Sequence, residues 1–332
     1  MPDQISITLL THTHPDGDAV GSSIGLYHFL KALGYQPKVV FPDNVPDNLK
    51  HLLPDPVCIH EEEKELGDRL LENCDLLIGL DFNQYSRTGS AQFAAARAKA
   101  RKLLIDHHLA PDIPAFDQVY SEPQRSSTCE LLYYLLLQHP QVQGKPACIP
   151  QKALYCLTTG LITDTNNFNN SISPATFRMA ADVCEQGIDL DQINEQLFRS
   201  NRPNRMDLMG FLLENRRTFL PEYGAEYLLF TLEDQKKFDY LPGESEGFVN
   251  LPLQTKRVRI SALFTETAEG HVRVSLRSKR GFSANRLARM FFNGGGHENA
   301  AGGRLFIPMD QVPGYFANAV GVFLQQEQDT RE

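Results

Sequence analysis

The stretch that decides the fold is Ile5–Ser22, ISITLLTHTHPDGDAVGS. It predicts a strand over Ile5–Leu10, a polar turn, and a helix over Asp18–Leu33 that ends with Gly34 in the C′ position. The same alternation of short apolar run, turn and helix continues along the chain to about residue 110. It predicts strands at Val39–Phe41, Cys74–Leu80 and Lys102–Ile105, and a helix over Ala91–Ala100. Continuous apolar strands alternating with helices indicate an α/β fold, a parallel sheet with helices on both faces.

The turn after the first strand carries three potential ligands for a hard metal ion, His12, Asp16 and Asp18. They lie at the carboxyl end of the strand, where open α/β sheets bind ligands. A simpler interpretation is that Asp16-Gly17 forms a tight turn and that Asp18 caps the following helix. This motif alone therefore does not establish a metal site.

Two further strands end in the same kind of residue. Cys74–Leu80 is followed by Asp81, and Lys102–Ile105 is followed by Asp106, His107 and His108. A carboxylate at the end of a buried strand is costly unless a cation or a hydrogen-bond donor meets it. Three such ends at one sheet edge favour a shared metal site over three separate turns and caps.

The chain becomes helical from about Ser126 and returns to strands after Pro221. Ser127–Glu130 is a capping-box pattern that opens the apolar run Leu131–Leu137. Further helices are expected over 150–163, 174–186 and 189–220, and strands over Tyr227–Leu232, Val258–Phe264 and Val272–Leu276. Asn201-Arg202-Pro203-Asn204 interrupts the helical region. We therefore predict a first domain over 1–200, a linker over 201–221, and a smaller α/β domain with a mixed sheet over 222–332.

Two later motifs could add to a phosphate or metal site. Asp164 ends an amphipathic helical stretch, as many helix ends do. In the second domain Arg277-Ser278 ends a strand, and Gly294-Gly295-Gly296-His297 precedes the small residues Ala300–Gly303. Consecutive glycines let backbone N–H groups approach an anion, and a helix starting at His297 would point its positive end there. Glycine runs also form plain flexible loops.

Composition limits the class of protein. The 332 residues are 42% hydrophobic and 22% charged, as in ordinary globular proteins. The longest apolar runs stop at seven residues, too short to span a bilayer. Residues 1–4 show no basic start of a secretory signal, so we expect a cytoplasmic protein without a membrane partner. The six cysteines contain no CxxC pair, which argues against a disulfide framework or a zinc ribbon.

The charge is unevenly distributed. The net charge of −9 argues against long duplex nucleic acid as the main partner. Between Lys256 and Arg304, however, ten residues are basic and three acidic, which leaves 22 basic and 38 acidic residues elsewhere. Such a split fits an anion held between a cationic surface and a carboxylate-rich metal site, although a solvated basic face would look the same.

Together, the His-x-x-x-Asp-x-Asp turn, the strand-ending Asp81, the Asp-His-His triplet, Asp164 and the Gly-Gly-Gly-His motif resemble the DHH/DHHA1 phosphoesterase family. The length and the two domains are most similar to its nanoRNase and pAp-phosphatase branch. The resemblance runs from residue 5 to about 310. Asn293 stands where many members of the family have the first of four glycines.

The resemblance implies a two-manganese centre. Asp81 would bridge the ions, His12 and Asp16 would bind one, and Asp18, His107 and Asp164 would bind the other. Manganese suits this mixture of carboxylates and imidazoles better than magnesium does, although magnesium or another divalent ion is an alternative. Two such ions activate a water and stabilise the leaving oxygen, so no protein nucleophile is needed.

Other residues would complete the site. Asp106 could orient His107, and His108 could face the scissile phosphate; either of the two could instead only support the ligands. Arg87 would meet a phosphate or pair with a carboxylate of the site. Arg277 and His297 would hold the terminal phosphate of the substrate, with the remaining second-domain residues Ser278, Gly294, Gly295 and Gly296 around it.

The implied substrates are short single-stranded oligoribonucleotides and 3′-phosphoadenosine 5′-phosphate (pAp). Two alternatives remain open at this point. One is a polyphosphatase or inorganic pyrophosphatase with the same metal site, and the other is a non-catalytic nucleotide-binding module. The sequence leaves the oligomeric state open, a homodimer included.

Overall fold

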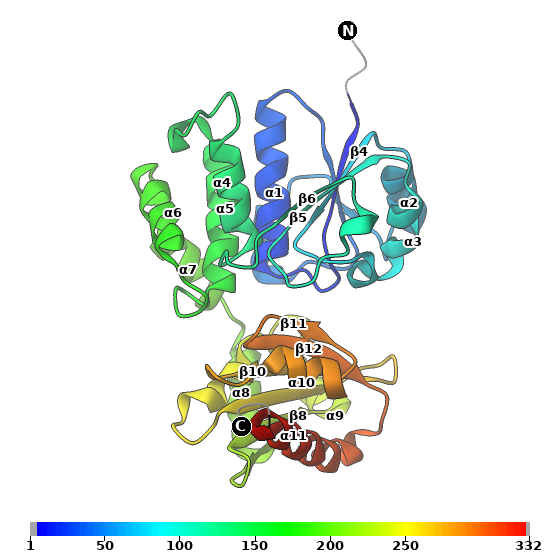
Figure 1. Cartoon of the computed structure of the whole chain (residues 1–332), viewed down its shortest axis with the longest axis vertical. Helices are drawn as coiled ribbons and strands as arrows, with labels where there is room; N and C mark the ends of the chain where they lie inside the picture. The colour runs from blue at the N-terminus through cyan, green and yellow to red at the C-terminus, as the bar shows by residue number, and fades with distance from the viewer. Residues whose placement is uncertain (1–4, 330–332) are drawn as a thin grey trace. The chain divides into compact units, whose positions relative to one another are not determined.

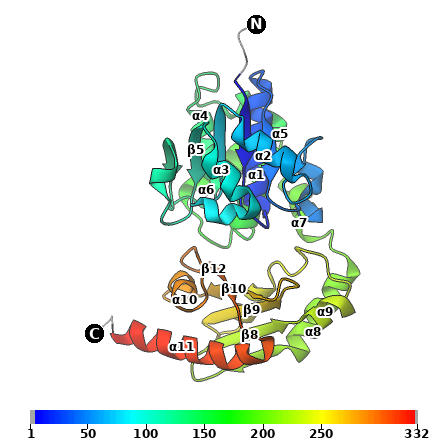
Figure 2. The same cartoon turned by 90° about the vertical axis from the view of Figure 1, so that its right-hand side faces the viewer.

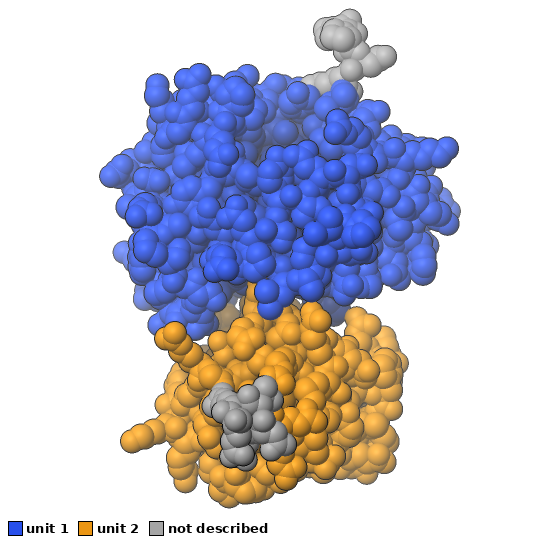
Figure 3. Space-filling model, in the orientation of Figure 1, with its two compact units in different colours: residues 1–200 blue, residues 201–332 orange. Residues whose placement is uncertain are grey.

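The computed structural model describes residues 5–329. The chain divides into two compact units, residues 1–200 and 201–332, coloured separately in Figure 3. The expectation about a secretory signal rests on residues 1–4, which lie outside the described part of the chain. Within that part, no helix combines the length and the apolar character that crossing a bilayer requires. All six cysteines are free thiols.

The first unit is built on a parallel six-stranded sheet, as the sequence predicts (Figure 1). The strand order is β3-β2-β1-β4-β5-β6, and every neighbouring pair is parallel. The strands are β1 (Ile7–Leu10), β2 (Lys38–Phe41), β3 (Cys58–Ile59), β4 (Leu76–Leu80), β5 (Arg101–Asp106) and β6 (Gln118–Ser121). Because β1, β4 and β5 are neighbours, the residues that follow them meet at one edge of the sheet.

Helices cover both faces of this sheet. Leu9 belongs to the core beneath α1 (Gly17–Ala32), α4 (Thr128–Leu137) and α5 (Gln151–Asp164), whereas Leu10 belongs to the opposite core. That second face, turned toward the viewer in Figure 2, carries α2 (Lys64–Glu72) and α3 (Gln92–Arg97). Helices α6 (Pro174–Glu185) and α7 (Leu190–Phe198) pack on α5.

Local signals fix where the helices at the site begin and end. The carboxylate of Asp16 accepts the N–H groups of Asp18 and Ala19 at 3.0 and 3.1 Å, and therefore caps α1. Gly34 follows the helix with φ +95°, as expected for the C′ position. Helices α1 and α5 approach closely because Gly160 has no side chain; a Cβ there would lie only 2.9 Å from the Gly17 carbonyl oxygen of α1. This contact brings the start of α1 close to the end of α5.

The second unit has a mixed sheet, also as expected, of order β11-β12-β10-β9-β8-β7. Among the described strands of this sheet, β8 and β9 pair in parallel and the other neighbours are antiparallel. The strands are β7 (Arg217–Leu220), β8 (Ala225–Phe230), β9 (Ile260–Glu266), β10 (Val272–Ser278), β11 (Gly295–Gly296) and β12 (Ala300–Leu305). The helices are α8 (Pro203–Asn215), α9 (Leu232–Lys237), α10 (Ala284–Phe291) and α11 (Val312–Asp329).

Two stretches differ from their predicted structure. Residues 201–221, expected as a linker and also as the end of a helix over 189–220, form α8 and then strand β7. Leu208 and Leu212 of α8 are buried against β8 and β9 of the second unit. The helix expected to start at His297 is wrong, since Ala300–Leu305 is strand β12. Its small residues allow close backbone contact: a Cβ at Gly303 would overlap the Phe292 carbonyl oxygen.

Candidate metal centre and phosphate-binding residues

Three neighbouring strands deliver the acidic and imidazole side chains to one sheet edge. His12 follows β1, Asp81 follows β4, and Asp106 ends β5. Asp81 has φ +65°, a conformation that costs a non-glycine residue of the order of 1–3 kcal/mol. Its N–H still donates to the Ile105 carbonyl at 3.1 Å, so the turn is anchored to the sheet while its carboxylate is buried.

The first group of potential ligands is His12, Asp16 and Asp81. Their ligand atoms lie within 4.8 Å of one another. His12 Nε2 is 3.3 Å from Asp81 Oδ2 and 3.9 Å from Asp16 Oδ1. His12 Nδ1 lies 2.7 Å from the Thr13 carbonyl, to which it donates, and this leaves the Nε2 lone pair toward the carboxylates.

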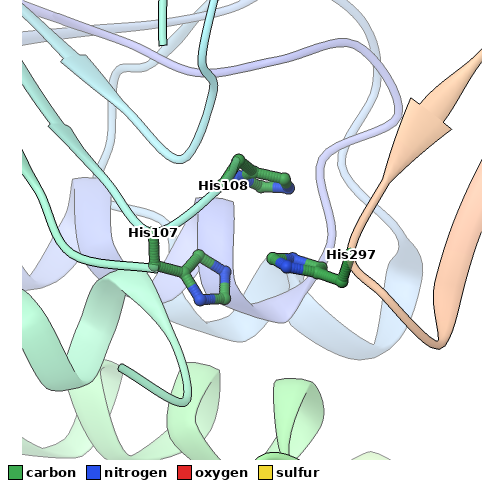
Figure 4. Close-up of side chains that lie close together, drawn as sticks. All are labelled: His107, His108 and His297. Carbon is green, nitrogen blue, oxygen red and sulfur yellow. The ribbon is translucent and has the colours of Figure 1, made fainter. Parts of the chain in front are cut away.

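The second group is Asp18, Asp81 and His107, again within 4.8 Å. His107 Nε2 is 3.6 Å from Asp18 Oδ2 and 3.7 Å from Asp81 Oδ1. Asp164, the last residue of α5, brings its Oδ2 to 3.3 Å from the same nitrogen. His107 and His108 directly follow β5, and their rings pack edge-to-face (Figure 4). Asp81 is thus common to both groups, and it also lies within the same distance of Asp106 and His108.

The electrostatics of these groups favour a cation. Asp18 and Asp81 are 1% exposed, and burial together with neighbouring carboxylates raises the pKa of Asp81 well above its usual value. Burial lowers the pKa of His12 to about 4, which keeps its imidazole neutral at pH 7. Burial also lowers the pKa of His107, but Asp164, Asp18 and Asp106 outweigh it and the net shift is upward. Closely spaced buried carboxylates beside the neutral imidazole of His12 fit a divalent cation.

Asp106 and His108 form a pair beside these groups. The sequence led us to expect that Asp106 orients His107, but its Oδ1 accepts from His108 Nδ1 at 2.7 Å. His107 Nδ1 instead lies 3.2 Å from the Arg125 carbonyl. Consecutive residues at the end of β5 point in different directions, which explains the exchange of partners. Burial raises the pKa of Asp106 to about 6.

Arg87 lies close to the site as well. It belongs to the 3₁₀ segment Tyr85–Ala91, and its carbonyl accepts the N–H of Thr13 at 2.8 Å. The charge of Arg87 lowers the pKa of both His12 and Asp106. The position of Arg87 is therefore compatible with both roles that the sequence left open: pairing with a carboxylate of the site, and binding a phosphate.

The structure adds residues that sequence reasoning missed. The hydroxyl of Thr128 donates to Asp81 Oδ1 at 3.0 Å. The backbone N–H groups of Thr128 and Cys129 donate to the two Asp18 oxygens at 2.6 and 2.9 Å. The capping-box pattern locates this helix start, and Ser127 does cap Glu130 N–H, but 110 residues separate Thr128 from Asp18 in the sequence. No local pattern could have joined them.

In the second unit the predicted phosphate-binding residues gather at one end of β10. Arg277 pairs with Ala300 of β12, whose carbonyl accepts the N–H of His297 at 2.7 Å. Ser278 is buried and its hydroxyl donates to the Phe282 carbonyl at 2.6 Å, so it holds a loop in place. Asn293 has φ +48°, a conformation that asparagine tolerates and glycine prefers.

The three glycines Gly294, Gly295 and Gly296 lie next to His297, where the chain pairs with β12. Gly295 and Gly296 form β11 beside β12, and Gly296 has φ +143°. A Cβ at Gly294 would overlap the Gly302 carbonyl oxygen. Close packing of two strands therefore requires part of this glycine run, whatever ligand it binds.

Comparisons with known proteins agree with this architecture. Residues 6–161 match the DHH family, N-terminal domain, and residues 224–307 match the DHHA1 domain. The chain is 30% identical over 304 residues to a protein of Thermus thermophilus named bifunctional oligoribonuclease and PAP phosphatase NrnA, covering 90% of this chain and 84% of that protein. It is 27% identical to a probable NrnA of Streptococcus mutans, covering 89% and 88%.

A solved structure is similar over almost the whole chain. An exopolyphosphatase-related protein from Bacteroides fragilis is 35% identical, with a TM-score of 0.88 and coverage of 98% of this chain and 94% of that one. Both domain matches fall within the two units described above, and the strand-end residues His12, Asp81 and Asp106 lie within the first matched domain. This chain therefore belongs to the DHH family of phosphoester hydrolases, and its carboxyl-terminal part contains a DHHA1 domain.

Proposed function

We propose that this protein is a manganese-dependent phosphoesterase that hydrolyses short single-stranded oligoribonucleotides and pAp. The observation that carries the proposal is that Asp81 belongs to both groups of potential ligands. A carboxylate shared between two ligand groups is suited to bridge two ions. The activities in the names of the two NrnA relatives support this choice of substrates. A cytoplasmic location, as predicted from the sequence, is part of the proposal.

The residues of the first unit hold the ions and the scissile phosphate. The ligands would be His12, Asp16, Asp18, Asp81, His107 and Asp164. Two bound ions would supply an activated water and charge stabilisation on the phosphoryl oxygens. His108, held by Asp106 through Nδ1, presents Nε2 for hydrogen bonding or proton exchange with the substrate. Arg87 adds a positive charge for the phosphate.

The second unit binds the rest of the substrate. Arg277 and His297 would bind the terminal phosphate, and Gly294–Gly296 would let the backbone approach it. A guanidinium is suited to this task because it offers several donors to one phosphate. A fixed anchor of this kind favours short substrates over long ones.

A second candidate is hydrolysis of polyphosphate, because the similar Bacteroides fragilis protein is described as exopolyphosphatase-related. A substrate panel separates the candidates: manganese-loaded full-length protein is assayed with the dinucleotide pApA, with pAp, and with polyphosphate and pyrophosphate. The proposal expects turnover of pApA and pAp. Turnover of polyphosphate or pyrophosphate alone would favour the second candidate, and binding without turnover would indicate a nucleotide-binding module.

Replacement of the shared carboxylate tests the metal centre. Asp81→Ala should abolish turnover while the fold survives, and the exposed Asp47→Ala serves as the control. Titration calorimetry with Mn²⁺ should show two bound ions in the wild type and weaker or incomplete binding in Asp81→Ala. Retention of more than about a tenth of the wild-type activity would contradict the two-metal assignment.

A further inference from the structure

The segment Arg125–Cys129, just before and at the start of α4, contacts three of the six proposed ligands. The carbonyl of Arg125 lies 3.2 Å from His107 Nδ1. The N–H groups of residues 128 and 129 donate to Asp18, and the Thr128 hydroxyl donates to Asp81. One short segment therefore fixes side chains that come from three different parts of the first unit.

The hydroxyl of Thr128 contacts the carboxylate of Asp81, the residue shared by the two ligand groups. It donates to Oδ1 of Asp81 at 3.0 Å, while Oδ2 of the same carboxylate faces His12 Nε2 at 3.3 Å. Oδ1 is also the oxygen nearer His107, at 3.7 Å. Each oxygen is thus directed toward a different ligand group, and rotation of the carboxylate would break the hydrogen bond from Thr128.

Thr128 itself cannot move freely. It is fully buried, its side chain is β-branched, and it occupies the first position of α4. The neighbouring Glu130 is also fully buried, and its carboxylate accepts the hydroxyls of Ser126 and Thr176 at 2.5 and 2.7 Å and the Arg125 guanidinium at 3.2 Å. These bonds tie Arg125 and Ser126 to Glu130, and through Thr176 they tie the segment to α6.

We propose that Thr128 is a positioning residue, whose hydroxyl holds the Asp81 carboxylate with one oxygen toward each ligand group. This inference rests on the proposed function, because it takes Asp81 as the shared metal ligand. Without the hydroxyl, the carboxylate would lose the donor that fixes its rotation about the Cβ–Cγ bond. Residues that support metal ligands in this way typically contribute 10- to 100-fold to metal affinity or activity, an order-of-magnitude range.

The test compares three variants of the full-length protein. Thr128→Val keeps the shape but removes the hydroxyl, and Thr128→Ser keeps the hydroxyl. Thr158→Val is the matched control, because Thr158 is equally buried but donates only to the Leu154 carbonyl within α5, at 2.7 Å. Affinity and stoichiometry for Mn²⁺ are measured by titration calorimetry, and the metal-free Tm reports folding.

The expected result is specific for the hydroxyl. Thr128→Val should bind Mn²⁺ about 10- to 100-fold more weakly and lose kcat rather than raise KM for pApA, because the ligands and not the substrate contacts are disturbed. Thr128→Ser should restore both values, and Thr158→Val should leave them unchanged. Thr128→Ala, which is smaller, takes the place of Thr128→Val if the valine lowers the metal-free Tm more than Thr158→Val does.

Two failures are distinguishable. If the wild type binds no Mn²⁺, the proposed function itself is wrong. If the wild type binds two ions and Thr128→Val binds them with the same affinity, the positioning role of Thr128 is overturned and the metal centre stands. Equal weakening in Thr128→Val and Thr158→Val would also overturn it, since the loss would then follow from any change in the core.

Discussion

Nδ1 of His108 lies 2.7 Å from Oδ1 of Asp106, and the two residues form a buried pair at the end of β5. Because an ionised carboxylate only accepts hydrogen bonds, the proton of the neutral imidazole resides on Nδ1. Nε2 is then the nitrogen that can exchange a proton with a bound phosphoester. The pair therefore has the geometry of an oriented acid or base, whereas His107 is directed toward the carboxylates.

Asp106→Asn tests whether His108 serves in proton exchange while His107 serves as a metal ligand. The substitution removes the charge that orients His108, so kcat for pApA should fall about 10- to 100-fold. Mn²⁺ affinity, measured by calorimetry, should stay at the wild-type value, because Asp106 is in neither proposed ligand group. Asp16→Asn is the comparison, and should weaken Mn²⁺ binding. An equal loss of affinity in both variants would identify Asp106 as a metal ligand.

The sequence predicts much of the fold and brings together most of the proposed ligands, for a physical reason. Strands such as β4 and β5 are continuous apolar runs, and a carboxylate directly after such a run is visible without any structure. The parallel sheet then brings Asp81 and Asp106 to one edge. These features depend on residues that are close in the sequence.

What the sequence could not predict depends on contacts between distant segments or on side-chain direction. Thr128 meets Asp81 and Asp18 only after α4 has packed beside α1. Whether Asp106 accepts a hydrogen bond from His107 or from His108 depends on the directions of these two consecutive side chains. The helix expected at His297 failed because the following small residues serve close strand pairing.

Gly294 and Gly295 form a matched pair of predictions in the second unit. A Cβ at Gly294 would overlap the Gly302 carbonyl oxygen, whereas at Gly295 the nearest atom would be Arg289 Nε at 3.8 Å. Gly294→Ala should therefore lower the free energy of unfolding by about 1–3 kcal/mol. Gly295→Ala should change it by less than about 0.5 kcal/mol. Denaturant titration followed by circular dichroism measures both; equal losses would contradict the close packing of this hairpin.

Asp43 gives a prediction for pH. Burial raises the pKa of this carboxyl from 3.8 to about 6, although it accepts the His14 N–H at 2.7 Å. Between pH 4 and 6 the folded protein then holds a proton that the unfolded chain has released, so stability falls as the pH rises. Asp43→Asn should remove up to about 3 kcal/mol of this decrease in the free energy of unfolding.

Unfolding of the wild type and of Asp43→Asn in EDTA at pH 4 and at pH 6 measures the difference. Asp47→Asn, at an exposed position, is the control. An equal fall in wild type and Asp43→Asn would contradict the prediction.

Arg277 tests the anchoring role of the second unit. An arginine bound to the terminal phosphate should contribute about 1.5–3 kcal/mol, so Arg277→Ala should lower kcat/KM for pApA roughly 10- to 150-fold. If the contact is equally strong in the ground and transition states, KM rises and kcat stays unchanged. Bis-p-nitrophenyl phosphate has only the scissile phosphate, so its hydrolysis should change little. Arg273→Ala is the control, because Arg273 lies on the same strand and the same face as Arg277, four residues before it. Equal losses on both substrates would mean that Arg277 acts at the metal centre or in folding, and the anchoring role would have to be abandoned.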